Sequence, residues 1–406
     1  MGESVLMKVG IIGYNLFAVG GTVQSNLNLL NIFSEQGCEI TYYNYVPFYL
    51  HDIKKVCTKY PQLSSVHFKL IKEFFNKQPE NKLDVIFITR EDLFPLAKLL
   101  RFYYPKALII GEIHTPLQLL GNLNGLKYLS CVRVATHSIK ENFEKKYDYT
   151  RIYVQPVSTR HIKWNFPKTT KLTTNFVIHS RFFEKQKDIM YSLQLFEYLK
   201  KQKQTGYHLY INGTGKDELL YQKFINDHQL TKMVSINQTL PNNYIYLSTS
   251  NFESFGYSIV EAIASGHFVV AYWGEDKVLY ENFKNIPQII WLKKQSVAAD
   301  VAKLQESSKK KLSLAEYQKS KEIIKNLTGN YYERFKRATL PYKSIKFESV
   351  KLTKTVMQDI QSEIEGNLGK LNPSMIKRIY YWMLHHPIFN KLFQNKLFQK
   401  FKSKVK

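Results

Sequence analysis

The sequence of 406 residues contains few cysteines, few acidic residues and no long apolar run. Its three cysteines, Cys38, Cys57 and Cys131, are far apart and form no C-x-x-C pair. This spacing argues against a disulfide scaffold and a zinc site, and it fits a reducing cytoplasm. No stretch approaches the roughly 20 apolar residues of a membrane span, and the first residues lack the apolar core of a secretion signal. We therefore expect a cytoplasmic globular protein without a metal or redox centre.

Apolar strands alternate with amphipathic segments along the chain. Lys8 to Gly13 is expected to form the first buried strand, and Thr22 to Glu35 has the apolar spacing of a helix. Such alternation predicts parallel sheets with crossover helices, and the length exceeds what one core usually supports. Further strands are expected in two series, at 40–45, 85–89, 108–113 and 132–136, and then at 174–179, 208–212, 244–247 and 267–271.

The two series of strands predict an α/β protein with two domains, each built on a parallel sheet. We place the first domain at residues 1–160 and the second at 161–320. A helix at 321–340 is expected to return toward the first domain, followed by a basic helical extension at 341–406. Residues 237–243, between a further β-prone segment at 233–236 and the strand at 244–247, are too few for a crossover helix.

Two glutamates are separated by seven residues in a segment that is expected to run from a strand through a loop into a helix. Glu253 lies before the helix, Gly256 permits close backbone approach, and Glu261 lies about two turns along it. The free N–H groups and the dipole of a helix start favour an anion, and carboxylates accept hydrogen bonds from ligand hydroxyls. The alternative interpretation is a solvated helix with two unrelated acids.

Residues 251–266 resemble the E-x7-E segment of the retaining glycosyltransferases of family 4, which use nucleotide-sugar donors. The resemblance implies the GT-B fold, in which two Rossmann-like, doubly wound domains face a cleft. Phe-Gly after the first glutamate and Glu-Ala-x-Ala-x-Gly at the second also match. The resemblance implies that Glu253 contacts the transferred sugar and that Glu261 binds the ribose. The backbone amides that it assigns to sugar hydroxyls and phosphate are those of Phe255, Gly256 and Tyr257.

Two other segments resemble the phosphate-binding parts of the same family. Gly20 and Gly21 follow the first strand, where the family has a paired glycine that faces the donor diphosphate and the acceptor. Arg181 opens a loop that resembles the family segment whose Arg and Lys neutralise the leaving diphosphate. Because the loop length differs, either Lys185 or Lys187 matches that lysine, with Lys185 preferred. Ordinary surface charges are the alternative in a chain so rich in lysine.

Two strand ends complete the resemblance. Gly213 follows the strand at 208–212 in a Gly-x-Gly element that resembles the lining of the base pocket. His114 ends the strand at 108–113, and members of the family often place a histidine there, near the primary hydroxyl of the donor sugar. A structural histidine before a proline is the alternative interpretation.

A formal net charge of +25, from 58 Lys and Arg against 33 Asp and Glu, predicts an anionic partner. The excess is greatest from Lys370 to Lys406, which contains no acidic residue and has apolar and aromatic residues at helical spacing on either side of Pro387. Basic amphipathic helices of this kind bind anionic membrane surfaces, and we assign that role to residues 372–406. Packing on a domain is the alternative, whereas no motif supports nucleic-acid binding.

The resemblance implies a retaining glycosyltransferase that needs no metal or other cofactor, and the chain has no Asp-x-Asp metal-diphosphate motif. The expected donor is a UDP-hexose or UDP-N-acetylhexosamine. The expected acceptor is a hydroxyl of an anionic or lipid-linked bacterial cell-surface glycan, a teichoic acid or a glycoprotein, reached by an enzyme peripheral to the inner face of the membrane. The alternatives are a non-catalytic GT-B subunit and a basic membrane- or nucleic-acid-binding protein. The sequence does not indicate an oligomeric state.

Overall fold

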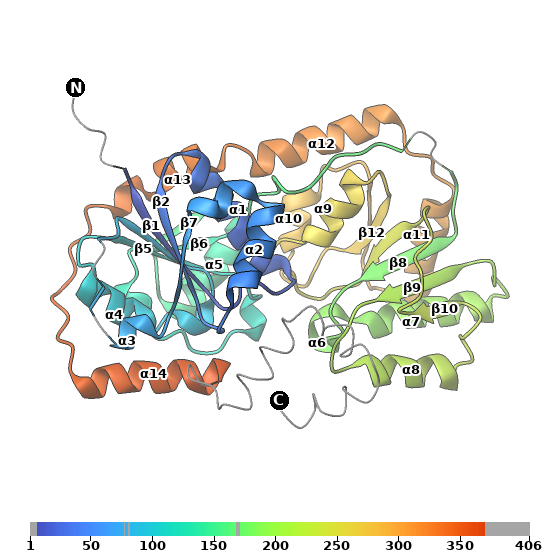
Figure 1. The fold of residues 1–406 in the computed structure, drawn as a ribbon. Coiled ribbons are helices and arrows are strands. Elements are labelled where there is room, and N and C mark those ends of the chain that lie inside the picture. Colours follow the sequence, from blue (N-terminus) through green and yellow to red (C-terminus); the bar gives the residue numbers. More distant parts are fainter. Residues whose placement is uncertain (1–5, 77, 80–81, 168–170, 370–406) are drawn as a thin grey trace.

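The computed structural model describes residues 6–76, 78–79, 82–167 and 171–369. Its described part consists of two α/β domains that lie side by side, each built on one parallel sheet (Figure 1). This arrangement confirms the fold expected from the alternation of strands and helices. The basic segment from Lys370 to Lys406, including the predicted membrane anchor at 372–406, lies outside the described residues.

The first domain has seven parallel strands in the order β3-β2-β1-β4-β5-β6-β7. Its four central strands are buried almost throughout because helices cover both faces, so they are apolar rather than alternating. The order reverses between β1 and β4, which is where doubly wound sheets bind ligands. The strands are β1 (Lys8–Gly13), β2 (Glu39–Asn44), β3 (His67–Leu70), β4 (Val85–Ile88), β5 (Leu108–Glu112), β6 (Cys131–Val134) and β7 (Ile152–Val154).

The second domain has six parallel strands in the order β10-β9-β8-β11-β12-β13. Here the order reverses between β8 and β11, so the carboxyl ends of these two strands form the expected ligand edge. Residues 237–244 contain no helix, as expected from their number. The strands are β8 (Asn175–His179), β9 (His208–Asn212), β10 (Val234–Ile236), β11 (Ile245–Ser248), β12 (Val269–Tyr272) and β13 (Ile289–Leu292).

Helices cover both sheets and lie in most of the connections between consecutive strands. The longer helices of the first domain are α1 (Gly21–Glu35), α2 (Leu50–Lys59), α4 (Leu96–Tyr103) and α5 (His137–Tyr147), with the short α3 (Glu73–Asn76). The helices of the second domain are α6 (Glu184–Lys187), α7 (Ile189–Lys201), α8 (Glu218–Asp227), α9 (Tyr257–Ala264), α10 (Val278–Phe283), α11 (Val297–Ser308) and α12 (Leu314–Thr328).

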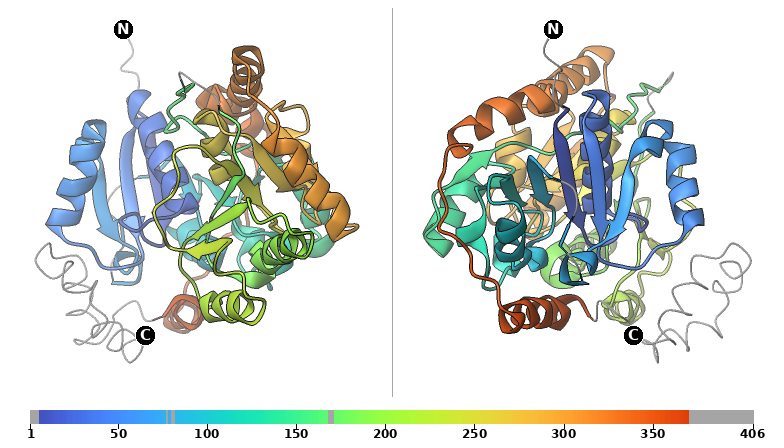
Figure 2. Two further views of the ribbon diagram at one scale, coloured as in Figure 1. Left: turned by 90° about the vertical axis from the view of Figure 1, so that its right-hand side faces the viewer. Right: turned by 60° about the vertical axis from the view of Figure 1, so that its left-hand side comes forward.

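The C-terminal part of the chain returns to the first domain. Helix α12 runs along the second domain, and α13 (Tyr331–Thr339) then places Tyr331 and Phe335 in the apolar core of the first (Figures 1 and 2). Helix α14 (Lys354–Leu368) buries Ile360 and Ile364 in a core cluster of the same domain. The described part of the expected extension is therefore packed against the first domain. Among the described residues, no helix is long and apolar enough to cross a membrane.

Candidate functional site

The segment that carries the two glutamates forms the junction expected from the sequence, from β11 through a loop into α9. Gly256 precedes the helix with φ 93°, a left-handed conformation that favours glycine. A Cβ atom at this position would lie 2.9 Å from Cδ2 of Leu279. The side chain of Phe255 is buried beneath the loop and anchors it. The N-terminal amides of α9 therefore point out of a loop whose backbone is fixed by packing.

Glu253 forms an ion pair with Lys187 across the carboxyl edge of the second sheet. Its Oε1 lies 2.5 Å from Nζ of Lys187, and the two side chains are only 13% and 14% exposed. The backbone reinforces this contact, because Asn251 donates its N–H to the carbonyl of Gln186 at 2.9 Å. The two loops that the sequence assigned to the donor sugar and to its diphosphate are thus in direct contact.

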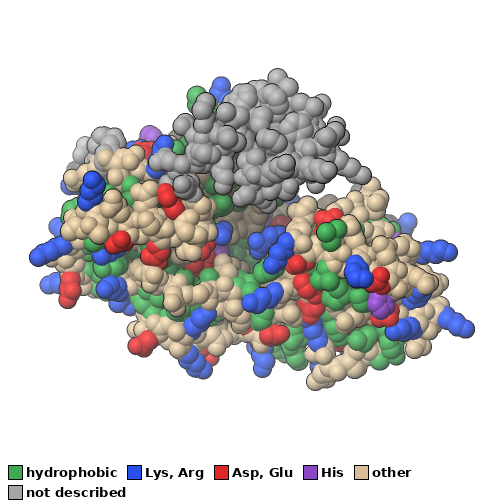
Figure 3. Space-filling view, turned by 90° about the horizontal axis from the view of Figure 1, so that it is seen from below, with side chains coloured by type: hydrophobic (Ala, Val, Ile, Leu, Met, Phe, Trp, Pro, Cys, Tyr) green, Lys and Arg blue, Asp and Glu red, His purple; other side chains and the backbone are tan. Residues whose placement is uncertain are grey.

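The structure brings Lys187, rather than the preferred Lys185, to this pair. Lys185 and Arg181 are both exposed. Asp188, which follows Lys187, has φ 44° and therefore occupies the left-handed conformation that glycine favours. In Figure 3, Lys and Arg side chains border the hollow between the two domains.

Gly213 lies where two strand ends of the second domain meet. A Cβ atom on Gly213 would collide with the backbone oxygen of Ser180, directly before Arg181. Gly215 is likewise in close contact with the backbone of Phe182. Both glycines are required for the close approach of these loops, so packing alone accounts for the Gly-x-Gly element that resembles a base pocket.

Gly20 and Gly21 of the first domain face α9 of the second. A Cβ atom on Gly21 would lie 3.5 Å from Cδ2 of Tyr257. The Tyr257 hydroxyl donates to the carbonyl of Ser158 at 2.9 Å, and burial raises the pKa of this phenol above its usual value. The first turn of the first domain therefore lies close to the start of α9 in the second domain.

Glu261 lies on α9 with its side chain 57% exposed. His161 approaches it from the segment that joins the domains, with 3.9 Å between Nε2 of His161 and Oε1 of Glu261. The His161 ring also packs edge-on against Tyr257. Sequence reasoning missed His161, because no motif marks it and only the fold brings it to α9. An exposed carboxylate beside the helix start remains accessible to ligand hydroxyls.

His114 lies in a buried ionic network at the carboxyl end of β5. Its Nε2 is 2.9 Å from Oε2 of Glu112, whose Oε1 is 2.9 Å from Nε of Arg133. Burial opposes ionisation of Glu112, but Arg133 and His114 outweigh it and hold the pKa of this carboxyl below its usual value. His114 thus has the partners of a structural histidine, while its position at a strand end also fits a ligand contact.

Asp276 is a second carboxylate near Glu253 that the sequence did not reveal. It lies in the loop between β12 and α10, and the backbone N–H of Glu275 joins this loop to the carbonyl of Asn251 at 2.8 Å. Burial, with smaller contributions from Glu253 and Glu275, raises the pKa of Asp276 to about 6. It was missed because only the packing of two strand ends places it beside the glutamate loop.

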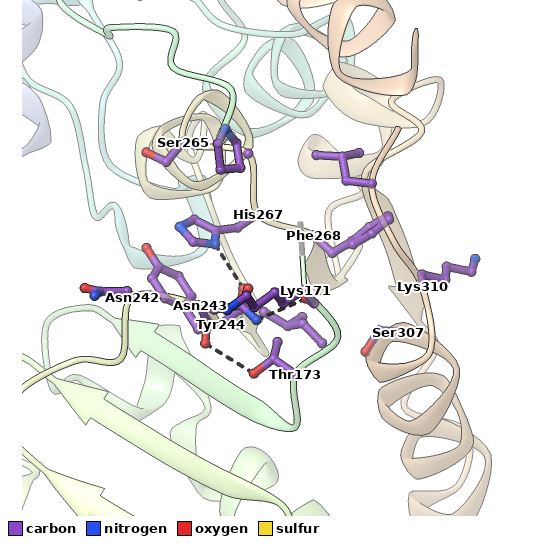
Figure 4. Close-up of a pocket in the computed structure, with 14 residues that line it drawn as sticks. Lys171, Thr173, Asn242, Asn243, Tyr244, Ser265, His267, Phe268, Ser307 and Lys310 are labelled. Carbon is purple, nitrogen blue, oxygen red and sulfur yellow. Dashed lines mark hydrogen bonds between the residues drawn. The ribbon is translucent and has the colours of Figure 1, made fainter. Parts of the chain in front are cut away.

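A separate pocket opens at the amino edge of the second sheet, away from Glu253 (Figure 4). The rings of Tyr244 and His267 stack there with 3.7 Å between their centroids, and Nδ1 of His267 lies 3.0 Å from the carbonyl of Tyr244. These residues precede β11 and β12, whereas ligands of open α/β sheets bind at the carboxyl ends of the strands. We therefore do not assign the donor to this pocket.

One family model matches the second domain. Residues 162–321 match the family model described as glycosyl transferases group 1, and this range contains Arg181, Lys187, Glu253 and Glu261. A search of curated protein sequences finds no match.

Solved structures with a similar fold include a point mutant of TarM from S. aureus in complex with fondaparinux, α-GlcNAc-glycerol and UDP. It is 13% identical with a TM-score of 0.63, over 84% of this chain and 100% of that one. The apo form of the lipopolysaccharide outer core galactosyltransferase WaaB is 16% identical with a TM-score of 0.59, over 82% and 99%.

The pneumococcal O-GlcNAc transferase GtfA in complex with UDP and GlcNAc is also similar, with 12% identity and a TM-score of 0.57, over 84% and 100% of the two chains. At these identities the structural likeness establishes the fold and not the substrate. The matched domain supplies the activity class. The chain is therefore a glycosyltransferase with the GT-B fold, and its residues 162–321 match the group 1 glycosyltransferase model.

Proposed function

We propose that this protein transfers a hexose or N-acetylhexosamine from a nucleotide sugar, with UDP as the expected nucleotide, and that it retains the configuration of the sugar without a metal ion. The observation that carries the proposal is the Glu253–Lys187 pair beside the start of α9. It places a carboxylate, a permanent cation and free helix amides at one strand edge, which suits an anionic, hydroxyl-rich ligand.

The proposed mechanism relies on charge. Lys187, Arg181 and the N-terminus of α9 offset the negative charge that develops on the leaving diphosphate, and such electrostatic stabilisation is usually the largest contribution to catalysis. Glu253 orients the transferred sugar and supports its cationic transition state. The acceptor hydroxyl then attacks from the face that the leaving group departs. Glu261 binds the ribose, and Gly20 and Gly21 face the diphosphate from the first domain.

For the acceptor we propose a hydroxyl of an anionic or lipid-linked cell-surface glycan, a teichoic acid or a glycoprotein, reached from the cytoplasmic face of the membrane. The net charge of +25 supports an anionic partner. The complexes of TarM and GtfA named above contain UDP, and WaaB is named as a lipopolysaccharide galactosyltransferase. These names agree with the proposed donor and the class of acceptor.

The test is an assay of the purified protein with a panel of UDP-, GDP- and ADP-sugars in the presence of EDTA. We expect hydrolysis or transfer from one UDP-sugar, with the anomeric configuration retained in the product. A protein that binds none of these donors and turns none over would instead be a non-catalytic GT-B subunit. Turnover that stops with EDTA and returns with a divalent cation would reject the metal-independent mechanism.

A further inference from the structure

Lys294 is a buried lysine that follows β13 in the second domain. Its side chain is 13% exposed, and its Nζ lies 4.3 Å from the centroid of the Tyr272 ring and 5.2 Å from that of Tyr191. A charged amine removed from water requires partners for its hydrogen-bond donors. The contacts of its ammonium group therefore indicate what the residue does.

All three donors of the Lys294 ammonium are used, and they end on two different loops. Nζ lies 2.5 Å from Oδ2 of Asp188, 2.6 Å from Oδ1 of Asn251 and 2.8 Å from the carbonyl of Thr249. Asp188 belongs to the loop after β8, whereas Thr249 and Asn251 belong to the loop after β11. A single side chain from β13 thus connects the ends of three parallel strands.

These two loops carry the ion pair of the proposed donor site. Asp188 directly follows Lys187, and Asn251 lies two residues before Glu253. Asp188 also caps α7, because its Oδ1 accepts from the N–H of Tyr191 at 3.3 Å. A shift of Asp188 or Asn251 therefore moves Lys187 or Glu253, whose carboxylate and ammonium groups are in hydrogen-bond contact.

We propose that Lys294 is a positioning residue that sets the distance between Lys187 and Glu253 by holding the loops after β8 and β11 against each other. The proposal rests on the function proposed above for that pair. Lys294 acts through the two loops and does not itself contact the donor. Burial lowers the pKa of Lys294, while the adjacent Asp188 opposes this shift. The ion pair with Asp188 therefore favours the charged form of this amine.

The test compares Lys294→Met with the double variant Lys294→Met/Asp188→Asn. Methionine keeps an unbranched apolar side chain of similar length but removes the donors, and asparagine still caps α7 and tolerates the left-handed conformation. The double variant avoids a buried unpaired carboxylate, so it stays informative if the single variant fails to fold. Leu304→Ala creates a cavity under the buried face of α11. It is the matched control for the effect of a loss of stability alone.

We expect both Lys294 variants to lower kcat on the order of 10- to 100-fold, because small misplacements of catalytic groups have effects of this size. Leu304→Ala is expected to lower the melting temperature while kcat stays within about threefold. Hydrogen exchange should accelerate in residues 184–188 and 249–253 of the Lys294 variants and not in the control. Adding Glu253→Gln to the double variant should give less than the product of the separate losses in kcat.

The proposal would be overturned if hydrogen exchange in both loops of the double variant proceeded at the wild-type rate. It would also be overturned if Leu304→Ala lost as much kcat as the Lys294 variants. The exchange measurement needs no substrate. If the wild-type protein transfers no sugar, the proposed function fails, and the exchange data still decide whether Lys294 holds the two loops together.

Discussion

At the scale of single residues, the site depends on a few charged side chains that lie close together and have little exposure to solvent. Glu253 and Lys187 are each less than 15% exposed, so their mutual attraction is screened less than that of a surface pair. Asp276 adds a second carboxylate on the other side of the Glu253 loop, and its raised pKa reflects burial and this neighbouring charge. Glu253 and Asp276 can each be replaced by an amide of the same size, which removes the charge alone.

Glu253→Gln should reduce turnover by roughly 100-fold or more, about 3 kcal/mol, with little change in donor affinity. Glutamine retains the shape and a hydrogen-bond acceptor but not the charge that supports the cationic transition state. Steady-state kinetics and titration calorimetry with the nucleoside diphosphate separate these two effects. Glu275→Gln, an exposed acid in the adjacent loop, is the control. Wild-type turnover in Glu253→Gln would exclude a catalytic role for this residue.

Lys187→Ala should slow transfer by about tenfold or more and weaken nucleoside-diphosphate binding, because charge-assisted hydrogen bonds to phosphate are strong. Lys185→Ala is the matched control from the same short helix, since Lys185 is exposed and we expect it to remain near wild type. Calorimetry and initial rates for the pair provide the comparison. If Lys185→Ala is the more damaging change, Lys185 rather than Lys187 corresponds to the family lysine, as the sequence comparison first preferred.

Asp276→Asn should stabilise the protein at neutral pH. A carboxyl whose pKa is raised on folding from 3.8 to about 6 binds its proton more tightly in the folded state. Its favourable contribution is complete below the unfolded pKa and is lost as the pH rises through about 6. At about 1.4 kcal/mol per pH unit, the penalty at pH 7 is on the order of 2 to 3 kcal/mol. Asparagine does not have this penalty.

Thermal melts of wild type and Asp276→Asn between pH 4 and pH 8 measure this effect. The two melting temperatures should converge at the acidic end and diverge as the pH rises, with the variant higher. A difference that stays constant over the whole range would show that Asp276 does not titrate as proposed. The remaining acceptor, Oδ1, still binds the N–H of Val278 in the variant, so the start of α10 is preserved.

At the scale of elements, the function depends on where strands end and helices begin. The start of α9, the end of β8 and the end of β11 meet at one sheet edge because the strands are parallel and neighbouring. Gly256 determines the direction in which the amides of α9 point, since its left-handed backbone turns the chain from loop to helix. A substitution of Gly256 therefore changes the orientation of the start of α9 rather than a single side-chain contact.

Gly256→Ala should cost about 1 to 2 kcal/mol of folding stability, because a Cβ is disfavoured at φ 93° and would press against Leu279. We also expect weaker nucleoside-diphosphate binding, as the turn that directs the helix amides shifts. Melting temperature and calorimetry report the two effects. Gly206→Ala, where the added methyl group meets no neighbour within 4 Å, is the control. If Gly256→Ala binds the nucleoside diphosphate with wild-type affinity, the α9 amides do not bind the diphosphate.

At the scale of the whole molecule, the second domain contacts the first at several positions. Glu281 of α10 accepts the N–H groups of His137 and Ser138 at 2.7 and 2.9 Å, so a carboxylate of one domain caps α5 of the other. Val278, on the same helix, is buried in the core of the first domain. Helices α13 and α14 then bring the C-terminal part of the chain back across the first domain (Figure 1).

Deletion of Asn372 to Lys406 should abolish binding to anionic liposomes while donor hydrolysis survives. The deleted segment contains no acidic residue, and each Lys or Arg near an anionic surface contributes roughly 1 kcal/mol of attraction that salt screens. Cosedimentation with anionic and neutral vesicles, at low and high salt, measures the effect. Equal binding with and without the segment, or equal binding to both vesicle types, would rule out a membrane anchor.

The sequence alone determined the architecture and indicated candidate site residues. Buried parallel strands are apolar throughout and amphipathic helices have a fixed period, so β1 and α1 were predicted within one residue. The short edge strand β3 was not predicted, because its residues are half-buried or exposed and form no apolar run. Gly20, Gly21, Glu253 and Glu261 could be predicted as site residues because their spacing along the chain is local and resembles known segments.

Only the tertiary structure decided which distant residues meet. Lys185 and Lys187 are equivalent by composition and nearly so by position, and the path of the backbone at Asp188 alone brings Lys187 to Glu253. Lys294 and Asp276 carry no motif, since their importance arises from strand ends that lie side by side in the sheet although they are far apart in the chain. Local spacing determines elements and motifs, whereas contacts between loops depend on the order of strands in the sheet, which the sequence pattern does not contain.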